Sequence, residues 1–165
     1  MVAELLLLPM TVDDAGACWE LDQKCFASGE AYDLETFHYL LTNPSVVARK
    51  IETSQGQMVG FAIGMLEPHA VGHVIAVAVD PQYRRRGLGL HLMIEIEAEF
   101  CRQGATIARL EVRTTNRPAQ RLYRKLGYVV TQRLSHYYIN GEDAYLMTKA
   151  LNSRSSRGGF RRFFR

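Results

Sequence analysis

Apolar and polar positions divide the middle of the chain into strands. Apolar side chains dominate Val46–Ile51 and Met58–Met65, and a turn signal, Gln55-Gly56, stands between them. This pattern predicts an antiparallel hairpin. A third run, His73–Val79, is apolar at almost every position and stops at Asp80-Pro81. Because this run lacks a polar face, we expect a strand in the centre of a sheet, buried on both faces.

After Gly87 the apolar period changes to that of a helix. One stripe is formed by Leu88, Leu92, Met93, Ile96 and Phe100. Gly104 is expected to end this helix. Thr106–Arg113 returns to the spacing of a strand, and Asn116 predicts the N-cap of a short helix that ends at Gly127.

Both ends of the chain add further elements. Leu5–Leu8 predicts a strand, while Thr11 and Asp33 predict the N-caps of two helices. Three strand-like runs close the chain: Tyr128–Thr131, His136–Ile139 and Ala144–Met147, with Asn140-Gly141 as a hairpin-turn signal before the last of them. The order of elements predicts a mixed α/β domain with a central sheet.

The chain is long enough for one domain with a buried core and a ligand cleft, at 165 residues. We place this domain at residues 1–151 and expect 152–165, a tail with five arginines and no acid, to be disordered. The formal charge is +3, but 15 basic and 17 acidic residues remain without the tail, a net charge of −2. This net charge of the domain does not imply that it binds nucleic acid, and we expect no DNA partner.

The cysteines indicate the compartment. Cys18, Cys25 and Cys101 show no Cys-x-x-Cys spacing and no clustered histidines, so a reduced cytoplasmic protein without a metal site or disulfides is the simplest interpretation. Leu5–Leu8 is too short to cross a membrane, and we expect no membrane partner. For the oligomeric state we expect a monomer or a weak dimer.

Arg84-Arg85-Arg86-Gly87-Leu88-Gly89 stands between a predicted strand and a predicted helix. Glycines let a backbone approach a ligand closely, and N–H groups at a helix start suit a diphosphate. A Walker loop is excluded because Gly-Lys-Ser/Thr is absent, and a dinucleotide fingerprint because Leu92 replaces its third glycine. From these residues alone, a phosphate-binding loop and a basic surface turn both remain open.

Longer strings resolve this choice. The string Val77-Ala78-Val79-Asp80-Pro81-x-Tyr83-Arg84-x-x-Gly87-x-Gly89 resembles the acetyl-CoA signature of the GNAT superfamily. Three later strings follow at the spacing of that superfamily: Leu110-Glu111-Val112-Arg113-x-x-Asn116, Leu122-Tyr123-x-x-Leu126-Gly127-Tyr128 and Tyr137-Tyr138-x-x-Gly141-Glu142-Asp143-Ala144. Together they are similar to RimI-type protein N-terminal acetyltransferases, which include an enzyme for a ribosomal protein. The resemblance implies the GNAT fold, a mostly antiparallel twisted sheet flanked by about four helices, and acetyl-CoA as donor without a metal.

Glu111 is the candidate general base. Strand alternation places Arg109, Glu111 and Arg113 on one face of Thr106–Arg113. Placing a carboxylate inside a central strand costs free energy unless the carboxylate is solvated, forms an ion pair or has a chemical role. On residue type alone, an ion pair with a neighbouring arginine is the competing interpretation; the resemblance implies a general base.

Tyr123 is the candidate general acid. It shares a helix stripe with Ala119, separate from Leu122 and Leu126, and such a tyrosine often only fills a core. The resemblance implies that it protonates the departing thiolate. A phenol near pKa 10 facing a thiol near 8.5 acts more readily as a hydrogen-bond donor than as a full acid.

The resemblance also implies the binding residues. The donor would be held by Val77, Ala78, Val79, Arg84, Arg85, Arg86, Gly87, Leu88, Gly89, Asn116 and Tyr123, with its pantetheine arm along a splayed or bulged strand. The acceptor groove would be lined by Glu30 and Tyr32, from the loop Ser28–Tyr32, and by Tyr137 and Tyr138.

Three functions follow from these observations. The first is acetylation of a protein N-terminus, with a ribosomal protein as one candidate acceptor. The second is acetylation of a lysine or a small amine by the same fold. The third is a non-catalytic acyl-CoA-binding or ribosome-associated module that uses the arginine tail. The string from Tyr137 to Ala144 favours the first.

Overall fold

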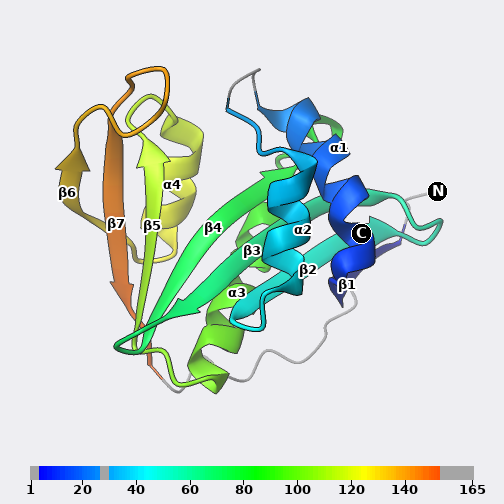
Figure 1. Ribbon diagram of the computed structural model, residues 1–165, viewed down its shortest axis with the longest axis horizontal. Helices are drawn as coiled ribbons and strands as arrows, with labels where there is room; N and C mark the ends of the chain where they lie inside the picture. Colours follow the sequence, from blue (N-terminus) through cyan, green and yellow to red (C-terminus); the bar gives the residue numbers. More distant parts are fainter. Residues whose placement is uncertain (1–3, 27–29, 153–165) are drawn as a thin grey trace.

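Seven strands form one sheet in the computed structural model, which describes residues 4–26 and 30–152 (Figure 1). The strands are β1 (Leu5–Pro9), β2 (Val46–Thr53), β3 (Met58–Glu67), β4 (Val71–Val79), β5 (Ile107–Arg113), β6 (Val129–Leu134) and β7 (Ala144–Ala150). Their order is β1-β2-β3-β4-β5-β7-β6, and only β4 and β5 pair in parallel. The predicted mostly antiparallel sheet is confirmed. Apart from Asn152, the predicted disordered tail lies outside the described residues.

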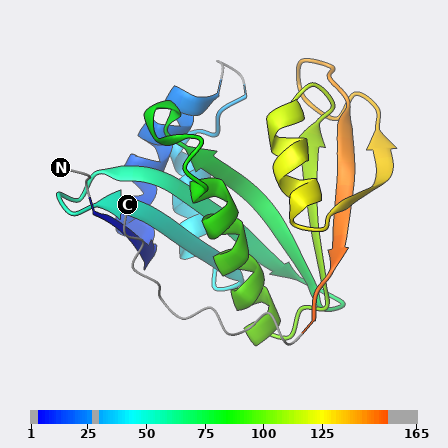
Figure 2. The same ribbon diagram turned by 180° about the vertical axis from the view of Figure 1, so that it is seen from behind.

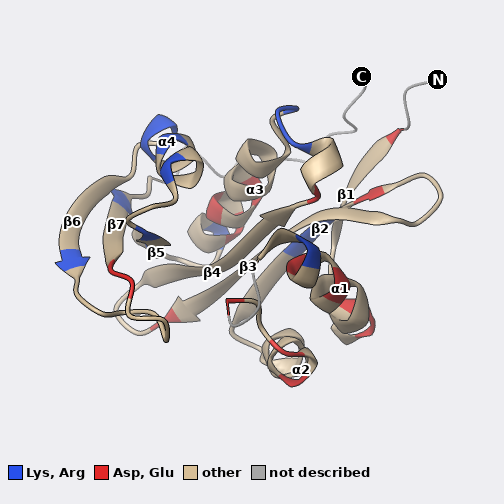
Figure 3. Cartoon of the chain, turned by 90° about the horizontal axis from the view of Figure 1, so that it is seen from above, with Lys and Arg blue, Asp and Glu red and all other residues tan. Residues whose placement is uncertain are grey.

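Helices cover both faces of the sheet (Figures 2 and 3). α1 (Ala15–Cys25) and α2 (Leu34–Thr42) lie on one face, and α3 (Leu88–Arg102) and α4 (Arg117–Lys125) on the other. The predicted caps form: Thr11 and Asp14 make a capping box, and Asp33 accepts a hydrogen bond from the Thr36 N–H at 2.7 Å. None of the described helices is long and apolar enough to cross a membrane.

Each face of the sheet has its own apolar core. Between the sheet and α3, the predicted stripe is buried, with Leu92, Ile96 and Phe100 fully inaccessible to solvent. On the opposite face, Phe37 of α2 packs edge-on against Phe61 of β3, with ring centroids 5.7 Å apart. These two layers hold the middle of the sheet rigidly, because apolar surface is removed from water on both sides.

Gly72 allows β4 to pass directly beneath the Phe100 ring. A methyl group added at Gly72 would lie 2.3 Å from that ring. We expect Gly72→Ala to destabilise the fold by about 1–3 kcal/mol through overpacking, measured by chemical denaturation. As a control, Gly16→Ala in α1 meets nothing within 4 Å and should be neutral or stabilising, since alanine favours a helix. Equal stability of the two variants would contradict close packing at Gly72.

The sheet opens where β4 meets β5. Pairing is restricted to Val71–His73 with Ile107–Arg109, and the two strands then diverge (Figure 1). Ile63 of β3 pairs with Ala76 of β4, but the next residue of β3, Gly64, pairs with Val74. This shift in register leaves Ile75 as one extra residue in β4. A bulge of this kind bends its strand and increases the local twist. The splayed and bulged strand that the resemblance implied is therefore present.

One predicted strand is wrong. Residues 136–139 form part of a turn between β6 and β7 rather than a strand. His136 has a φ of 52°, and its N–H donates to an Asp143 carboxylate oxygen at 2.9 Å. The Tyr138 N–H donates to the Glu142 carbonyl at 3.1 Å. These bonds close the segment on itself, so its backbone cannot join the sheet, although the predicted turn at Gly141 is present.

Candidate active site

A cleft of about 250 Å³ occupies the gap between the diverging strands. One wall is the edge of β4 from Val74 to Val77, and the other is β5 from Leu110 to Arg113. The remaining lining residues are Asp22, Phe26, Glu30, Tyr32, Asn116, Ala119, Tyr123, Tyr137 and Tyr138. The cleft therefore brings together Glu111, Tyr123 and the four residues assigned to the acceptor.

Glu111 lies in this cleft with both carboxylate oxygens paired. Its Oε1 accepts from Arg109 at 2.7 Å, and its Oε2 is 2.6 Å from His73 Nε2. The other His73 nitrogen, Nδ1, is 2.6 Å from Glu67, and Glu67 also pairs with Arg109 at 2.8 Å. We call this closed ring of four side chains the Glu111 network. Both nitrogens of His73 thus face carboxylates.

The Glu111 network holds its carboxylate ionised. Burial raises the pKa of Glu111, but the hydrogen bond from His73 and the positive charges of His73 and Arg109 lower it below its ordinary value. The ion pair with an arginine, the competing interpretation from the sequence, is thus real. It does not exclude a chemical role, because Glu111 also lines the cleft and each carboxylate oxygen can accept more than one hydrogen bond.

Tyr123 and Asn116 face the cleft from α4. The Asn116 side chain accepts a hydrogen bond from the Ala119 N–H at 3.2 Å, so its predicted capping role is confirmed. Burial raises the pKa of Tyr123 to about 12, and its ring stands edge-on to Tyr128 with centroids 6.0 Å apart. The phenol therefore stays protonated at neutral pH and can donate a hydrogen bond there.

The loop Arg84–Gly89 has the conformation expected of an anion site. Arg85 and Gly87 have φ values of 63° and 77°, and Gly87 is the N-cap of the 15-residue α3. The first N–H groups of a helix have no partner within it and lie at its positive end. The Arg84 Nε donates to the Val79 carbonyl at 3.0 Å, and Arg86 lies over the Tyr83 ring at 4.9 Å. These contacts tie the loop to β4.

The residues of β4 that were predicted to bind the acetyl donor divide into two groups. Val77 lines the cleft. The Ala78 side chain is buried in the core against α1 and α2, so only its backbone can serve a ligand. The Val79 carbonyl already accepts from Arg84 and from the Cys25 thiol. Leu88 is likewise buried and can offer only its N–H.

Arg113 links two segments at one end of the cleft. Its guanidinium lies over the Tyr138 ring at 3.7 Å, pairs with Glu142 at 2.6 Å and lies 3.6 Å from Glu30. Tyr137 stands edge-on to Tyr138, with centroids 5.0 Å apart. One cation thus joins the turn between β6 and β7 to the loop that carries Glu30.

Asp22 of α1 is a buried carboxylate that sequence reasoning did not select. It is 2% exposed and accepts the Tyr32 N–H at 2.8 Å. Burial raises the pKa of Asp22 to about 6, although the hydrogen bond from Tyr32 lowers it. Asp22 therefore fixes the end of the loop that presents Glu30 and Tyr32; residues 27–29 of that loop lie outside the described part.

The other residues missed from the sequence are His73 and Glu67. His73 is the one polar side chain in the run His73–Val79, and that exception was the available signal. Glu67 carries no such signal. Among the described residues, no group of three or more His, Cys, Asp or Glu side chains is arranged to hold a metal ion.

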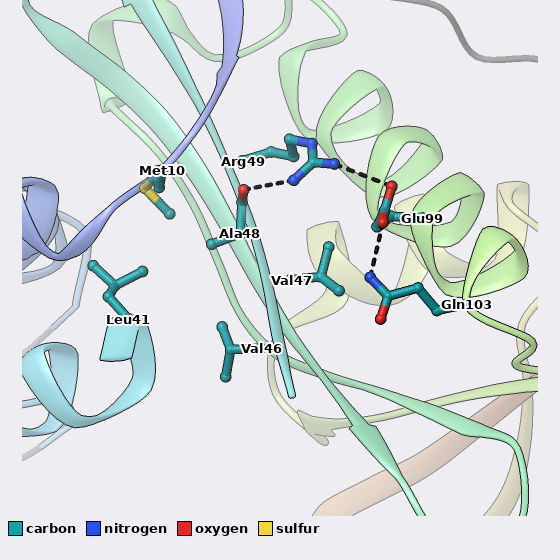
Figure 4. A pocket seen from close by; sticks show the side chains of 8 residues that line it. All are labelled: Met10, Leu41, Val46, Val47, Ala48, Arg49, Glu99 and Gln103. Atoms are coloured by element: carbon teal, nitrogen blue, oxygen red, sulfur yellow. Dashed lines mark hydrogen bonds and ion pairs between the residues drawn. The ribbon is translucent and has the colours of Figure 1, made fainter. Parts of the chain in front are cut away.

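A smaller cavity of about 140 Å³ lies at the edge of β2, away from this cleft (Figure 4). Arg49 crosses it, donating to the Ala48 carbonyl at 2.9 Å and pairing with Glu99 at 3.3 Å. Gln103 donates to the same Glu99. Because none of the residues selected from the sequence lines this cavity, it is not the candidate catalytic site.

Comparison with known proteins identifies the class. Residues 14–128 match the acetyltransferase (GNAT) family. The chain therefore belongs to this family and is an acetyl-CoA-dependent acetyltransferase. It is 35% identical over 148 residues to N-alpha-acetyltransferase RimI of Mycobacterium tuberculosis, covering 85% of this chain and 89% of the relative.

Two further proteins are similar. An N-alpha-acetyltransferase of Sulfurisphaera tokodaii is 47% identical over 81 residues, so the match spans about half of each chain, 48%. The crystal structure of the ribosomal-protein-S18-alanine N-acetyltransferase from Escherichia coli superposes with a TM-score of 0.80 at 26% identity, covering 97% of this chain and 99% of that one. The predicted GNAT fold and RimI-type resemblance are confirmed.

Proposed function

We propose that the protein transfers the acetyl group of acetyl-CoA to the N-terminal α-amino group of a protein, in the cleft between β4 and β5. The observation that carries this proposal is the meeting of Glu111 and Tyr123 in one cleft. Acyl transfer to an amine needs a neutral amine and a stabilised leaving thiolate. A carboxylate and a protonated phenol match these two requirements.

Acetyl-CoA would supply the activated acetyl group. Its phosphates fit the loop Arg84–Gly89, where the positive φ values turn the backbone and the N-terminus of α3 offers N–H groups. Its pantetheine amides fit the edge of β4 at Val77, which has no strand beside it on the β5 side, and the Asn116 side chain. The residues present thus suit this donor.

Glu111 would accept the proton of the acceptor amine, directly or through water. A carboxylate with a lowered pKa is a weak base, so it suits an amine that is already partly neutral. An α-amino group titrates near 8 and a lysine near 10.4, so their neutral fractions at pH 7.5 differ by about two orders of magnitude. The Glu111 network therefore supports a protein N-terminus over a lysine. His73 and Arg109 act as positioning residues.

Tyr123 would stabilise the departing thiolate by a hydrogen bond. With a pKa of about 12, its phenol is a weaker acid than a thiol near 8.5. Complete proton transfer from Tyr123 is therefore uphill, and the thiolate takes its proton from solvent as it leaves. Tyr123 would thus act as a hydrogen-bond donor to the thiolate rather than as the general acid that the resemblance implied.

The acceptor class rests on the relatives. The two curated relatives are N-alpha-acetyltransferases, and the structural neighbour from Escherichia coli acts on a ribosomal-protein alanine. The tyrosines 32, 137 and 138 would line the path of the acceptor chain. A ribosomal protein is the first candidate acceptor.

Peptides with two amines test this proposal. An alanine-initiated peptide with one internal lysine should be acetylated only at its N-terminus, located by tandem mass spectrometry. The same peptide with a blocked N-terminus should be turned over at least about 100-fold more slowly, because its lysine is rarely neutral. Acetylation of the blocked peptide alone would refute the N-terminal assignment while leaving the acetyltransferase class intact.

A further inference from the structure

The outer face of α4 carries four cations with no partner among the described residues. Arg117, Arg121, Arg124 and Lys125 are all exposed, and none of their side chains makes a hydrogen bond, ion pair or ring contact with the described residues. Apart from Pro118, no other residue of α4 is exposed. The exposed face of this nine-residue helix therefore carries positive charges and no negative charge.

This face points away from the catalytic cleft. Asn116, Ala119 and Tyr123 line the cleft, and they share one side of the helix. At about 100° per residue, the centre of the cationic face lies roughly 150° around the helix from that side. Between the cationic side and the cleft side of the helix lie Gln120, which is buried, and Leu126, which contacts the core. The four cations are therefore not aimed at the catalytic pair Glu111 and Tyr123 in the cleft.

The average charge of the domain hides a strong segregation. Residues 1–80 hold eleven acidic and three basic residues, a net charge of −8, whereas residues 81–151 hold six acidic and twelve basic residues, a net charge of +6. Figure 3 shows acidic residues on α1 and α2 and basic residues on α4, and it also shows acidic residues on α3. This separation of charge creates an electrostatic potential at the protein surface that the small net charge of the domain does not reveal. The inference from net charge, that nucleic acid is not implied, therefore does not hold for this face.

We propose that the outer face of α4 is a docking surface for the phosphate backbone of RNA. Protein interfaces are anchored by aromatic residues together with arginine and are depleted in lysine. The exposed face of α4 has arginine and lysine but no aromatic residue. Arginine and lysine along one helix face match a row of phosphates, which are recognised by charge and without sequence. Binding of RNA at this surface would bring the cleft close to acceptor proteins that are carried on RNA. The RNA-binding role of α4 does not depend on the acceptor proposed above.

A pair of charge-matched variants tests the surface in the full-length protein. The probe is a fluorescein-labelled 20-base-pair RNA hairpin, with binding followed by fluorescence anisotropy between 50 and 300 mM KCl. Arg121→Gln with Arg124→Gln removes two positive charges from α4. Gln55→Glu with Gln57→Glu adds two negative charges at the exposed turn between β2 and β3. Both variants have the same net charge and the same tail.

We expect the α4 variant to bind the hairpin at least about tenfold more weakly and to reduce the slope of log K against log salt by about 2, one for each lost phosphate contact. The turn variant should keep the wild-type slope. Peptide kcat/KM and acetyl-CoA affinity should be unchanged in both. Equal losses in the two variants, wild-type binding by the α4 variant, or a loss of acetyl-CoA affinity in it would each overturn the proposal.

Discussion

Glu111→Gln is expected to lower kcat by about 10²–10⁴-fold, the usual contribution of a positioned proton acceptor, with acetyl-CoA affinity changed by no more than about twofold. Glutamine has nearly the same shape but cannot accept a proton at neutral pH. Steady-state kinetics with a free N-terminal peptide would measure the first quantity, and calorimetric titration with acetyl-CoA the second.

The competing interpretation, that Glu111 only pairs with its neighbours, is tested by Glu67→Gln. Glu67 contacts the same His73 and Arg109 but does not line the cleft. The change disturbs the Glu111 network while leaving the proposed base in place, so we expect a loss of kcat below about tenfold. If both variants lose activity equally, or if Glu111→Gln keeps the wild-type rate, Glu111 is structural and the proposed base is wrong.

Gly87→Val is expected to weaken acetyl-CoA binding by at least about 100-fold. Gly87 has a φ of 77°, which a β-branched residue rarely adopts, so the N-terminus of α3 must change its backbone. The loss of two charge-assisted hydrogen bonds at about 1.5 kcal/mol each would account for this factor. Calorimetry with acetyl-CoA measures it directly.

Gly56→Val is the matched control. Gly56 lies in the turn between β2 and β3 with a φ of 84° and open space around it. This variant carries the same backbone strain far from the phosphate loop, so it should lose stability but keep acetyl-CoA affinity. Normal binding by Gly87→Val, or an equal loss in both variants, would contradict the assignment of this loop to the donor phosphates.

Local patterns predicted most of the fold because they depend on residues close in sequence. The caps at Thr11, Asp33 and Asn116, and the buried stripe of α3, are recognisable from spacing alone, and the structure confirms them. The segment at residues 136–139 was predicted wrongly for the same reason. Its strand-like aromatics were visible, while the hydrogen bond from His136 to Asp143 that closes the turn was not.

By itself, the sequence determined most of the order of elements, and it predicted the donor loop and the pair Glu111 and Tyr123, since each is written in a short string. Only the tertiary structure decided how these residues are arranged. It joined Glu111 to His73, 38 residues away, and through His73 to Glu67 on a third strand. It also left the four cations of α4 exposed, on the side of that helix that faces away from the cleft. Contacts between distant strands, and the side of a helix that stays exposed, depend on packing in three dimensions, which no local pattern specifies.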